Sequence, residues 1–441
     1  MAYEIVLGRS PIEKRSLGLR GSVYLGKLYV QMGQTTSLSN PVYLDVNGSH
    51  VVFVCGKRGS GKSYAMSAIA EGMITLPEDI KNDVAIVLLD TMGVFWTMKY
   101  PNARDEEMLK SWGLEPKGLD VKIFTPKGVF DSSRDKGIPV DKPFSLMPSE
   151  LDGEDWCTAF SIDSTSPLGV YIDRIILDLK EKNSDYDVLS ILQKIDEVKD
   201  VEEHVRIAAK NRFIAVERWG LFEKGGTPIT DLVSGGQATI LDLSEYATMP
   251  NGWQVKFLVV GLISKKLFLQ RMKTRKSEEL EAVKSAVHVL AQDRVEEKMP
   301  LVWLVIDEAH EFLPKDGKTA SSDALIAILR EGRQPGISLI LATQQPGKIH
   351  TDVMTQSDVV ISFRLTAKMD IDALSALMQS YLREGLNSAL DKLPTAQGSA
   401  IVLDDKNERL YQIKVRPKVS WHGGGSPTLL KEEKTLFSFE I

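Results

Sequence analysis

Eight consecutive residues, 56 to 63, have the types and spacing of a phosphate-binding loop. Their sequence, GKRGSGKS, fits the pattern G-x-x-x-x-G-K-[ST] without a gap. Glycines in such a loop let the backbone approach phosphate oxygens, and the helix that follows points its free N–H groups at the anion. Lys62 would reach the β- and γ-phosphates, and Ser63 would hold Mg²⁺. We therefore expect ATP and Mg²⁺ as cofactors, with nucleotide contacts from Gly56, Lys57, Arg58, Gly59, Ser60, Gly61, Lys62, Ser63 and Tyr64.

A second chemical element lies far along the chain. The apolar run 301–306 ends in Asp307 and Glu308, which is the form of a Walker B strand. Asp307 would bind Mg²⁺ directly or through water, and Glu308 would orient and activate the water that attacks the γ-phosphate. The alternative is a strand that stops at a polar turn, and the phosphate loop makes that alternative the weaker one. Both elements follow apolar runs, which places them at the carboxyl edge of an open α/β sheet.

Three further polar residues are candidates for catalysis. Arg330 and Arg333 are three residues apart, so they share a helix face just before a Pro-Gly pair that ends the helix. A helix carries its far end away from its own phosphate loop, so these arginines suit the γ-phosphate of a neighbouring subunit. The alternative is a solvated helix end, where cations are favoured. Gln344 follows the apolar run 339–343 and is expected to sense the γ-phosphate.

Apolar runs that alternate with helical patterns predict an α/β fold with a mostly parallel sheet. The expected strands are residues 51–55, 84–89, 239–243, 301–306, 339–343 and 359–365. Helices are expected over 64–73 and about 252–272, and the charged stretch 273–298 is either a solvated helix or a loop. The expected divisions are a β module (1–49), an ATPase core (50–99 and 231–396), a mainly helical insertion (100–230) and a C-terminal extension (397–441).

The composition is that of a soluble globular protein. Of the 441 residues, 43% are hydrophobic and 26% are charged. The net charge of −6 gives no overall sign of nucleic-acid binding, although a ring can carry basic charge on its inner surface alone. The two cysteines, Cys55 and Cys157, lack metal-type spacing, which favours a reduced, cytoplasmic setting. The apolar run 257–264 is too short to span a bilayer, and we expect no membrane attachment.

These motifs together resemble the HerA branch of the HerA/FtsK superfamily of DNA-pumping ATPases. The resemblance is carried by Tyr24–Lys27, the loop 56–63, Asp90 with Gly93, Ile240–Leu243, Val305–His310, Arg330–Arg333, Ala342–Pro346, Val415–Pro417 and His422–Gly424. It implies a RecA-like core with an N-terminal HAS-type barrel, a helical insertion and a C-terminal extension. It also implies a homo-hexamer around double-stranded DNA, with ATP bound between subunits. The residues before the core are few for such a barrel, which puts its usual docking surface in doubt.

The function that this resemblance implies is an ATP-driven duplex-DNA translocase or helicase. It would work with a nuclease partner, NurA-like or a defence effector, in DNA end processing or anti-phage defence. The alternative is an ATP-regulated ring scaffold that assembles and controls a nuclease or other effector without processive pumping. A conjugation-type coupling ATPase is disfavoured by the lack of a membrane segment.

Four other features have competing interpretations. His310 is expected to be a packed loop histidine, although it lies close enough to Glu308 in sequence to touch the site. The basic run 271–276 is expected to be solvated rather than to face DNA. Arg364 is equally suited to a phosphate contact and to a structural ion pair. The segment 234–237, SGGQ, is similar to an ABC-type signature but precedes a strand, so we expect a turn there.

Overall fold

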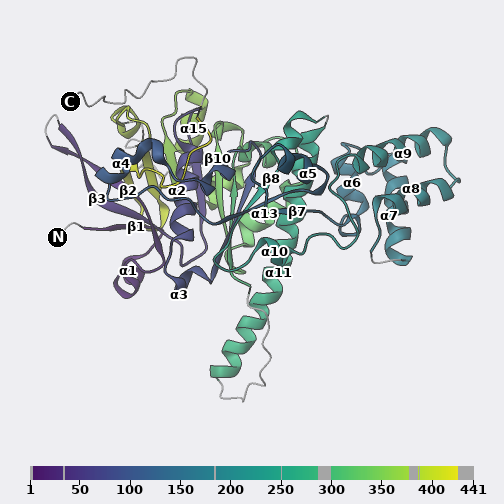
Figure 1. Cartoon of the computed structure of the whole chain (residues 1–441), viewed down its shortest axis with the longest axis horizontal. Helices are drawn as coiled ribbons and strands as arrows, with labels where there is room; N and C mark the ends of the chain where they lie inside the picture. Colours follow the sequence, from purple (N-terminus) through teal and green to yellow (C-terminus); the bar gives the residue numbers. More distant parts are fainter. Residues whose placement is uncertain are drawn as a thin grey trace, which may run out of the picture.

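The computed structural model describes residues 3–32, 35–182, 185–249, 251–286, 299–376, 386 and 388–425. The strands within these residues are β1 (Ile5–Leu7), β2 (Ser22–Met32), β3 (Thr35–Asp45), β4 (Val51–Cys55), β5 (Val84–Asp90), β6 (Val121–Pro126), β7 (Lys142–Phe144), β8 (Ala238–Asp242), β9 (Leu301–Ile306), β10 (Ile337–Thr343), β11 (Val359–Phe363), β12 (Ser399–Asp404) and β13 (Arg409–Val415). They form one sheet in the order β1-β3-β2-β13-β12-β11-β4-β10-β9-β5-β8-β6-β7 (Figure 1).

The helices lie on both sides of this sheet. They are α1 (Pro11–Leu17), α2 (Lys62–Ile74), α3 (Glu78–Lys81), α4 (Glu106–Ser111), α5 (Lys127–Asp135), α6 (Gly153–Ala159), α7 (Pro167–Lys182), α8 (Val188–Glu197), α9 (Glu203–Glu217), α10 (Ile229–Leu232), α11 (Gly252–Ala286), α12 (Ala309–Phe312), α13 (Ser322–Glu331), α14 (Thr351–Gln356) and α15 (Lys368–Ala376). None of these helices combines the length and apolar character that crossing a bilayer requires.

The part of the sheet from β11 to β7 is parallel throughout. Its central strands are buried at every position, as continuous β-branched runs predict for a sheet covered on both faces. Alternate residues of β4 enter two separate cores. Phe53 belongs to the core that includes residues of α11 and α13, whereas Val54 belongs to the core that includes residues of α2. This packing fixes the carboxyl ends of the strands, where ligands bind in open α/β sheets.

The N-terminal strands extend the sheet. β2 pairs antiparallel with β13, with Gly26 opposite Val415, and in Figure 1 the purple strands lie beside the yellow C-terminal ones. The approach is close, because a Cβ atom on Gly26 would lie 2.1 Å from the Lys414 carbonyl oxygen. The separate barrel that the resemblance implied is therefore not confirmed, since β1 to β3 continue the sheet of the core.

The segment 100–230 contains more than helices. Helices α6 to α9 form a bundle at one end of the molecule (Figure 1), as the patterns in that segment predict. Within the same segment, however, β6 and β7 extend the central sheet beyond β8. We predicted neither strand. β7 has only three residues, two of them exposed, and so short a strand gives no readable periodicity. β6 has six residues but lies in a segment whose pattern is mostly helical.

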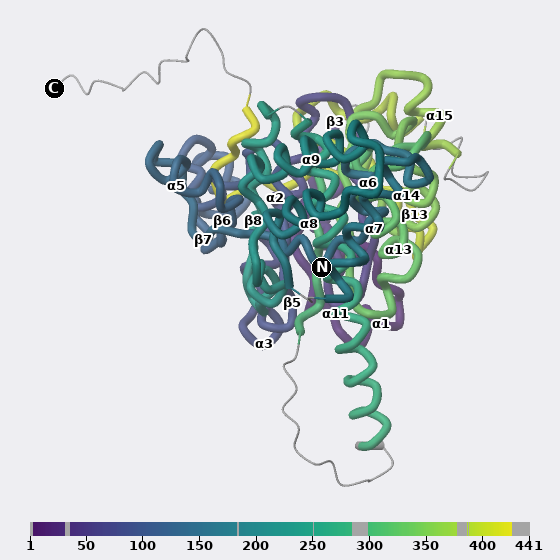
Figure 2. The backbone as a smooth tube through the Cα atoms, turned by 90° about the vertical axis from the view of Figure 1, so that its right-hand side faces the viewer, coloured from purple at the N-terminus to yellow at the C-terminus, as the bar shows by residue number. Residues whose placement is uncertain are grey.

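Helix α11 is longer than the sequence pattern predicted. It continues to Ala286, so the first half of the charged stretch is a helix, and residues 287–298 lie outside the described residues. Figures 1 and 2 both show its second half projecting from the body. The expectation of a solvated basic run is wrong for Arg271. Its side chain is buried and donates to the carbonyl oxygens of Pro335 and Met299, each at 2.6 Å. Those carbonyls supply the partners that solvent would otherwise provide.

Candidate nucleotide site

The phosphate loop follows β4 and leads directly into α2, as expected. Lys57 and Arg58 lie exposed at its tip, where a ligand can reach them. Three of its residues have the left-handed backbone that favours glycine: Gly56 (φ 153°), Gly59 (φ 73°) and Gly61 (φ 113°). A Cβ atom on Gly56 would lie 2.6 Å from Cβ of Phe363, and the Lys57 N–H donates to the Arg364 carbonyl at 3.1 Å. The loop is thus held against β11, with Arg364 contributing a backbone contact.

The loop and the Walker B strand meet through side chains. The Ser63 hydroxyl donates to Asp307 Oδ2 at 2.7 Å, and Lys62 is only 6% exposed, with Nζ donating to the Lys57 carbonyl at 3.2 Å. Burial raises the pKa of Asp307, and burial lowers the pKa of Lys62 despite the nearby carboxylates of Asp307 and Glu308. The structure therefore brings together the four residues that the sequence predicted for phosphate, Mg²⁺ and water.

These residues fit ATP and Mg²⁺. A serine hydroxyl next to a carboxylate supplies the oxygen ligands that Mg²⁺ takes beside nucleotide phosphates. In addition, Ser60 Oγ and Glu308 Oε2 are buried and have no hydrogen-bond partner within the described residues. Leaving such atoms unpaired costs about 1–3 kcal/mol each. A phosphate oxygen near Ser60 and a polarised water near Glu308 would satisfy both atoms.

Glu308 has an unusual conformation. Its φ and ψ of 51° and 42° are left-handed, which is a strained backbone for a residue with a side chain. Oε1 accepts a hydrogen bond from the Gln344 side-chain amide, so the predicted base and the predicted sensor are in contact. His310 is packed, as expected, but it also lies beside the site, with Nδ1 at 3.6 Å from Glu308 Oε2.

The predicted arginines lie near the amino ends of the parallel strands, whereas the phosphate loop and Glu308 lie at the carboxyl ends. Arg330 Nε donates to Asp352 at 2.6 Å, and Arg333 lies 3.5 Å from Asp358. Both side chains are largely exposed, at 59% and 61%. Asp358 immediately precedes β11, whereas the phosphate loop follows the parallel strand β4. Strands of five to seven residues separate these edges by about 15–20 Å. Neither arginine therefore serves the phosphate loop of its own chain.

Asp358, the ion-pair partner of Arg333, belongs to a buried network of charged residues that the sequence did not predict. His50 donates from Nδ1 to Asp358 Oδ2 at 2.7 Å and from Nε2 to Asp45 Oδ2 at 2.9 Å. Asp45 in turn pairs with the buried Arg9. Burial acts against the charged form of His50, but the two carboxylates outweigh it and raise its pKa to about 9. No spacing rule links these four residues, because they meet only when the N-terminal strands join the core.

The C-terminal segment is fixed to the phosphate-loop helix. Arg416 and Glu71 form a buried ion pair at 2.9 Å, and Arg416 also donates to the Ala68 carbonyl at 2.6 Å. The backbone N–H of Lys418 donates to the Tyr64 hydroxyl at 2.6 Å. Tyr64, predicted to contact nucleotide, is thus placed between the loop and this segment.

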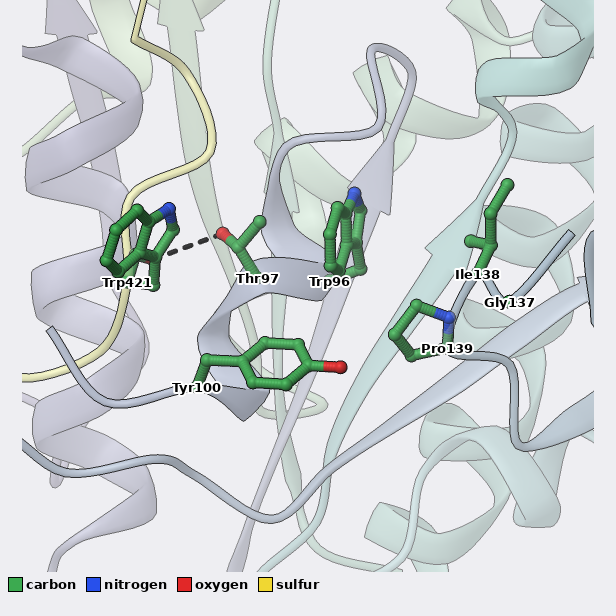
Figure 3. Close-up of a pocket in the computed structure, with 7 residues that line it drawn as sticks. All are labelled: Trp96, Thr97, Tyr100, Gly137, Ile138, Pro139 and Trp421. Atoms are coloured by element: carbon green, nitrogen blue, oxygen red, sulfur yellow. Dashed lines mark hydrogen bonds between the residues drawn. The ribbon is translucent and has the colours of Figure 1, made fainter.

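Two other features lie apart from the site. An aromatic pocket of about 430 Å³ is lined by Trp96, Tyr100, Pro139 and Trp421 with their neighbours (Figure 3), and none of the predicted site residues lines it. The SGGQ segment is a turn, as predicted. The Gly236 N–H donates to the Val84 carbonyl at 2.8 Å just before β8 begins.

Comparisons with known proteins agree with these observations. The family model described as "Helicase HerA, central domain" matches residues 23–267, and the model described as "Zonular occludens toxin (Zot)" matches residues 238–373. A probable DNA double-strand break repair helicase HerA from Methanocaldococcus jannaschii is 31% identical over 119 residues, which are 25% of this chain and 24% of that protein. The corresponding helicase from Sulfurisphaera tokodaii is 24% identical over 338 residues, which are 71% of this chain and 62% of that protein.

Among solved structures, VirB4 of Thermoanaerobacter pseudethanolicus superposes with a TM-score of 0.52 at 12% identity, covering 90% of this chain and 96% of that one. At that identity the likeness shows the fold, and it confirms the predicted P-loop α/β core. The chain spans less than two thirds of the length of the two HerA relatives. Because the HerA model covers more than half of the 441 residues, the chain belongs to the HerA helicase central-domain family of P-loop ATPases.

Proposed function

We propose that the chain hydrolyses ATP between the subunits of a homo-hexameric ring and uses the energy to move double-stranded DNA. The observation that carries this proposal is the position of Arg333 at the opposite edge of the sheet from Lys62 and Glu308. An arginine exposed at that edge completes a site only on a neighbouring copy, which makes each subunit contact heterologous. Such contacts close into a ring when the rotation between copies allows it.

Each residue has a distinct role in this proposal. Lys62 and the loop amides bind the phosphates. Ser63 and Asp307 would hold Mg²⁺, which would supply positive charge next to the phosphates. Glu308 accepts a proton from the attacking water at its carboxylate, and Gln344 reports the γ-phosphate through its contact with Glu308. Arg333 of the neighbouring subunit stabilises the transition-state charge, with Arg330 as a second candidate.

The DNA substrate is supported by the relatives, which are described as DNA double-strand break repair helicases. Contacts would be made to phosphates, so binding should be independent of sequence and weaken with salt. We further propose a nuclease partner, NurA-like or a defence effector, in DNA end processing or anti-phage defence, and a cytoplasmic setting.

The test is the effect of duplex DNA on ATP turnover by the full chain at low and high salt. A motor predicts stimulation of several-fold or more, lost at high salt. Glu308→Gln should bind ATP but lower turnover by about 10²–10⁴-fold, whereas Glu154→Gln, an exposed acid on α6, serves as the matched control. ATP turnover that does not change when duplex DNA is added would favour the ring scaffold. Wild-type turnover by Glu308→Gln would refute the assignment of Glu308 as the base.

A further inference from the structure

The carboxylate of Glu308 is held on one side only. Oε1 accepts from Gln344, while Oε2 is buried and lacks a hydrogen bond. A general base needs its free oxygen aimed at water, so a second support determines where the carboxylate points. Nδ1 of His310 is a candidate for this support. It lies 3.6 Å from Oε2, which is too long for a hydrogen bond but needs only a small movement to form one.

His310 is itself anchored to the end of β10. Nδ1 lies 3.0 Å from the Thr343 hydroxyl, and Nε2 lies 3.3 Å from the Gln345 side-chain nitrogen. The imidazole is 9% exposed, so the ring stays within this shell. Nε2 also lies 3.3 Å from Glu311 Oε1, but the Glu311 side chain is 44% exposed and can turn to water. The amide nitrogen of Gln345 then donates to Nε2, and the ring proton lies on Nδ1. That proton is the one that faces both Thr343 and Glu308.

We propose that His310 is a positioning residue for Glu308. When the nucleotide site is complete, the Nδ1–H group of His310 leaves the Thr343 hydroxyl and donates its hydrogen bond to Glu308 Oε2 instead. Thr343, Gln344 and Gln345 then all act on the base, two through His310 and one directly. Thr343 is paired with Cys55 in β4, the strand that leads into the phosphate loop. A movement of the phosphate loop can therefore reach Glu308 through the paired ends of β4 and β10.

This inference rests on the proposed role of Glu308. It predicts that ATP turnover depends on where the hydrogen-bond donor to Glu308 lies. Replacing His310 by asparagine or by glutamine tests this, because the two side-chain amides differ in length. Asn places its nitrogen near Nδ1, whereas Gln places it near Nε2. His310→Asn should keep kcat within about fivefold of wild type, while His310→Gln and His310→Ala should lower kcat by about 10–100-fold. KM for ATP should change little in all three, because the histidine does not touch the loop.

The controls separate positioning from folding. His204→Ala, on an exposed side chain of α9, should turn over ATP as wild type does. Thermal unfolding and ATP affinity are measured for every variant, since a purely structural histidine would lower stability and raise KM together. Equal losses in the Asn and Gln variants, or wild-type kcat in His310→Ala, would overturn the inference. Glu308→Gln run in parallel shows separately whether the assigned base has failed.

Discussion

The two edges of the central sheet differ in how their charges are satisfied. At the carboxyl edge, Ser60 and Glu308 keep buried atoms without partners, and Asp307 is held by a single serine hydroxyl besides its neighbour's N–H. At the amino edge, His50 and the carboxylates of Asp45 and Asp358 pair with one another, and among the described residues near them Asp404 Oδ1 is buried without a hydrogen bond. Unpaired buried groups suit a site that receives a ligand, whereas paired groups suit a support. The carboxyl edge keeps buried atoms available to a ligand, and the amino edge carries the exposed arginines Arg330 and Arg333.

The largest expected effect tests whether the edges act on each other. Arg333→Ala should lower kcat for ATP hydrolysis by about 10³-fold or more, because the transition state loses its trans arginine. Nucleotide affinity should change only a few-fold, since Arg333 lies far from its own loop. Steady-state turnover and binding of a fluorescent ATP analogue give the two quantities. A kcat within tenfold of wild type would mean that Arg333 does not act on the phosphate site of the neighbouring subunit.

A mixing experiment then tests the link directly. Arg333→Ala subunits retain an intact loop, and Lys62→Ala subunits retain an intact arginine. In an equal mixture about a quarter of the contacts in a ring combine both intact halves. Turnover should therefore recover to a measurable fraction of wild type. Verified mixed rings that stay inactive would count against an arginine supplied in trans.

An intermediate effect concerns the stability of the amino edge. The pKa of His50 is raised from 6.5 to about 9, so the charged imidazole stabilises the fold fully below pH 6.5 and progressively less as pH rises toward 9. The loss is at most about 3 kcal/mol. Denaturant unfolding at pH 6.5 and 9 should show it in the wild type and show much less of it in His50→Asn. The same pH dependence in both proteins would mean that another group is responsible.

The smallest effect should come from the other arginine. Arg330 is exposed and already paired with Asp352, and such pairs contribute about 0.2–1 kcal/mol. Arg330→Ala should thus lower kcat less than tenfold and barely change the unfolding midpoint. If Arg330→Ala instead matched Arg333→Ala in turnover, both arginines would act on the neighbour, and the pairing with Asp352 would be a resting contact.

The sequence predicted best what is local and chemically specific. The phosphate loop and the Walker B acids are contiguous motifs, and the structure joins them through Ser63 and Asp307. It predicted poorly what depends on distant contacts. In the sequence, Arg271 looks like one of several basic surface residues. Only the fold brings the carbonyl oxygens of Pro335 and Met299 to its guanidinium group. His50 gives no signal of its own, because its partners lie on both sides of it in the chain, one of them more than three hundred residues away.

The pairing of β2 with β13 has a consequence for synthesis. Gly26 in β2 cannot pair with β13 until Val415 has been synthesised. At typical rates of about 5–20 residues per second, the ribosome needs roughly 20–80 s to synthesise the chain from Gly26 to Val415. During that interval β2 can pair with β3 but leaves its other side open to any nascent copy nearby. The contact that completes the sheet therefore forms late in synthesis, after a period in which β2 is exposed as an unpaired edge.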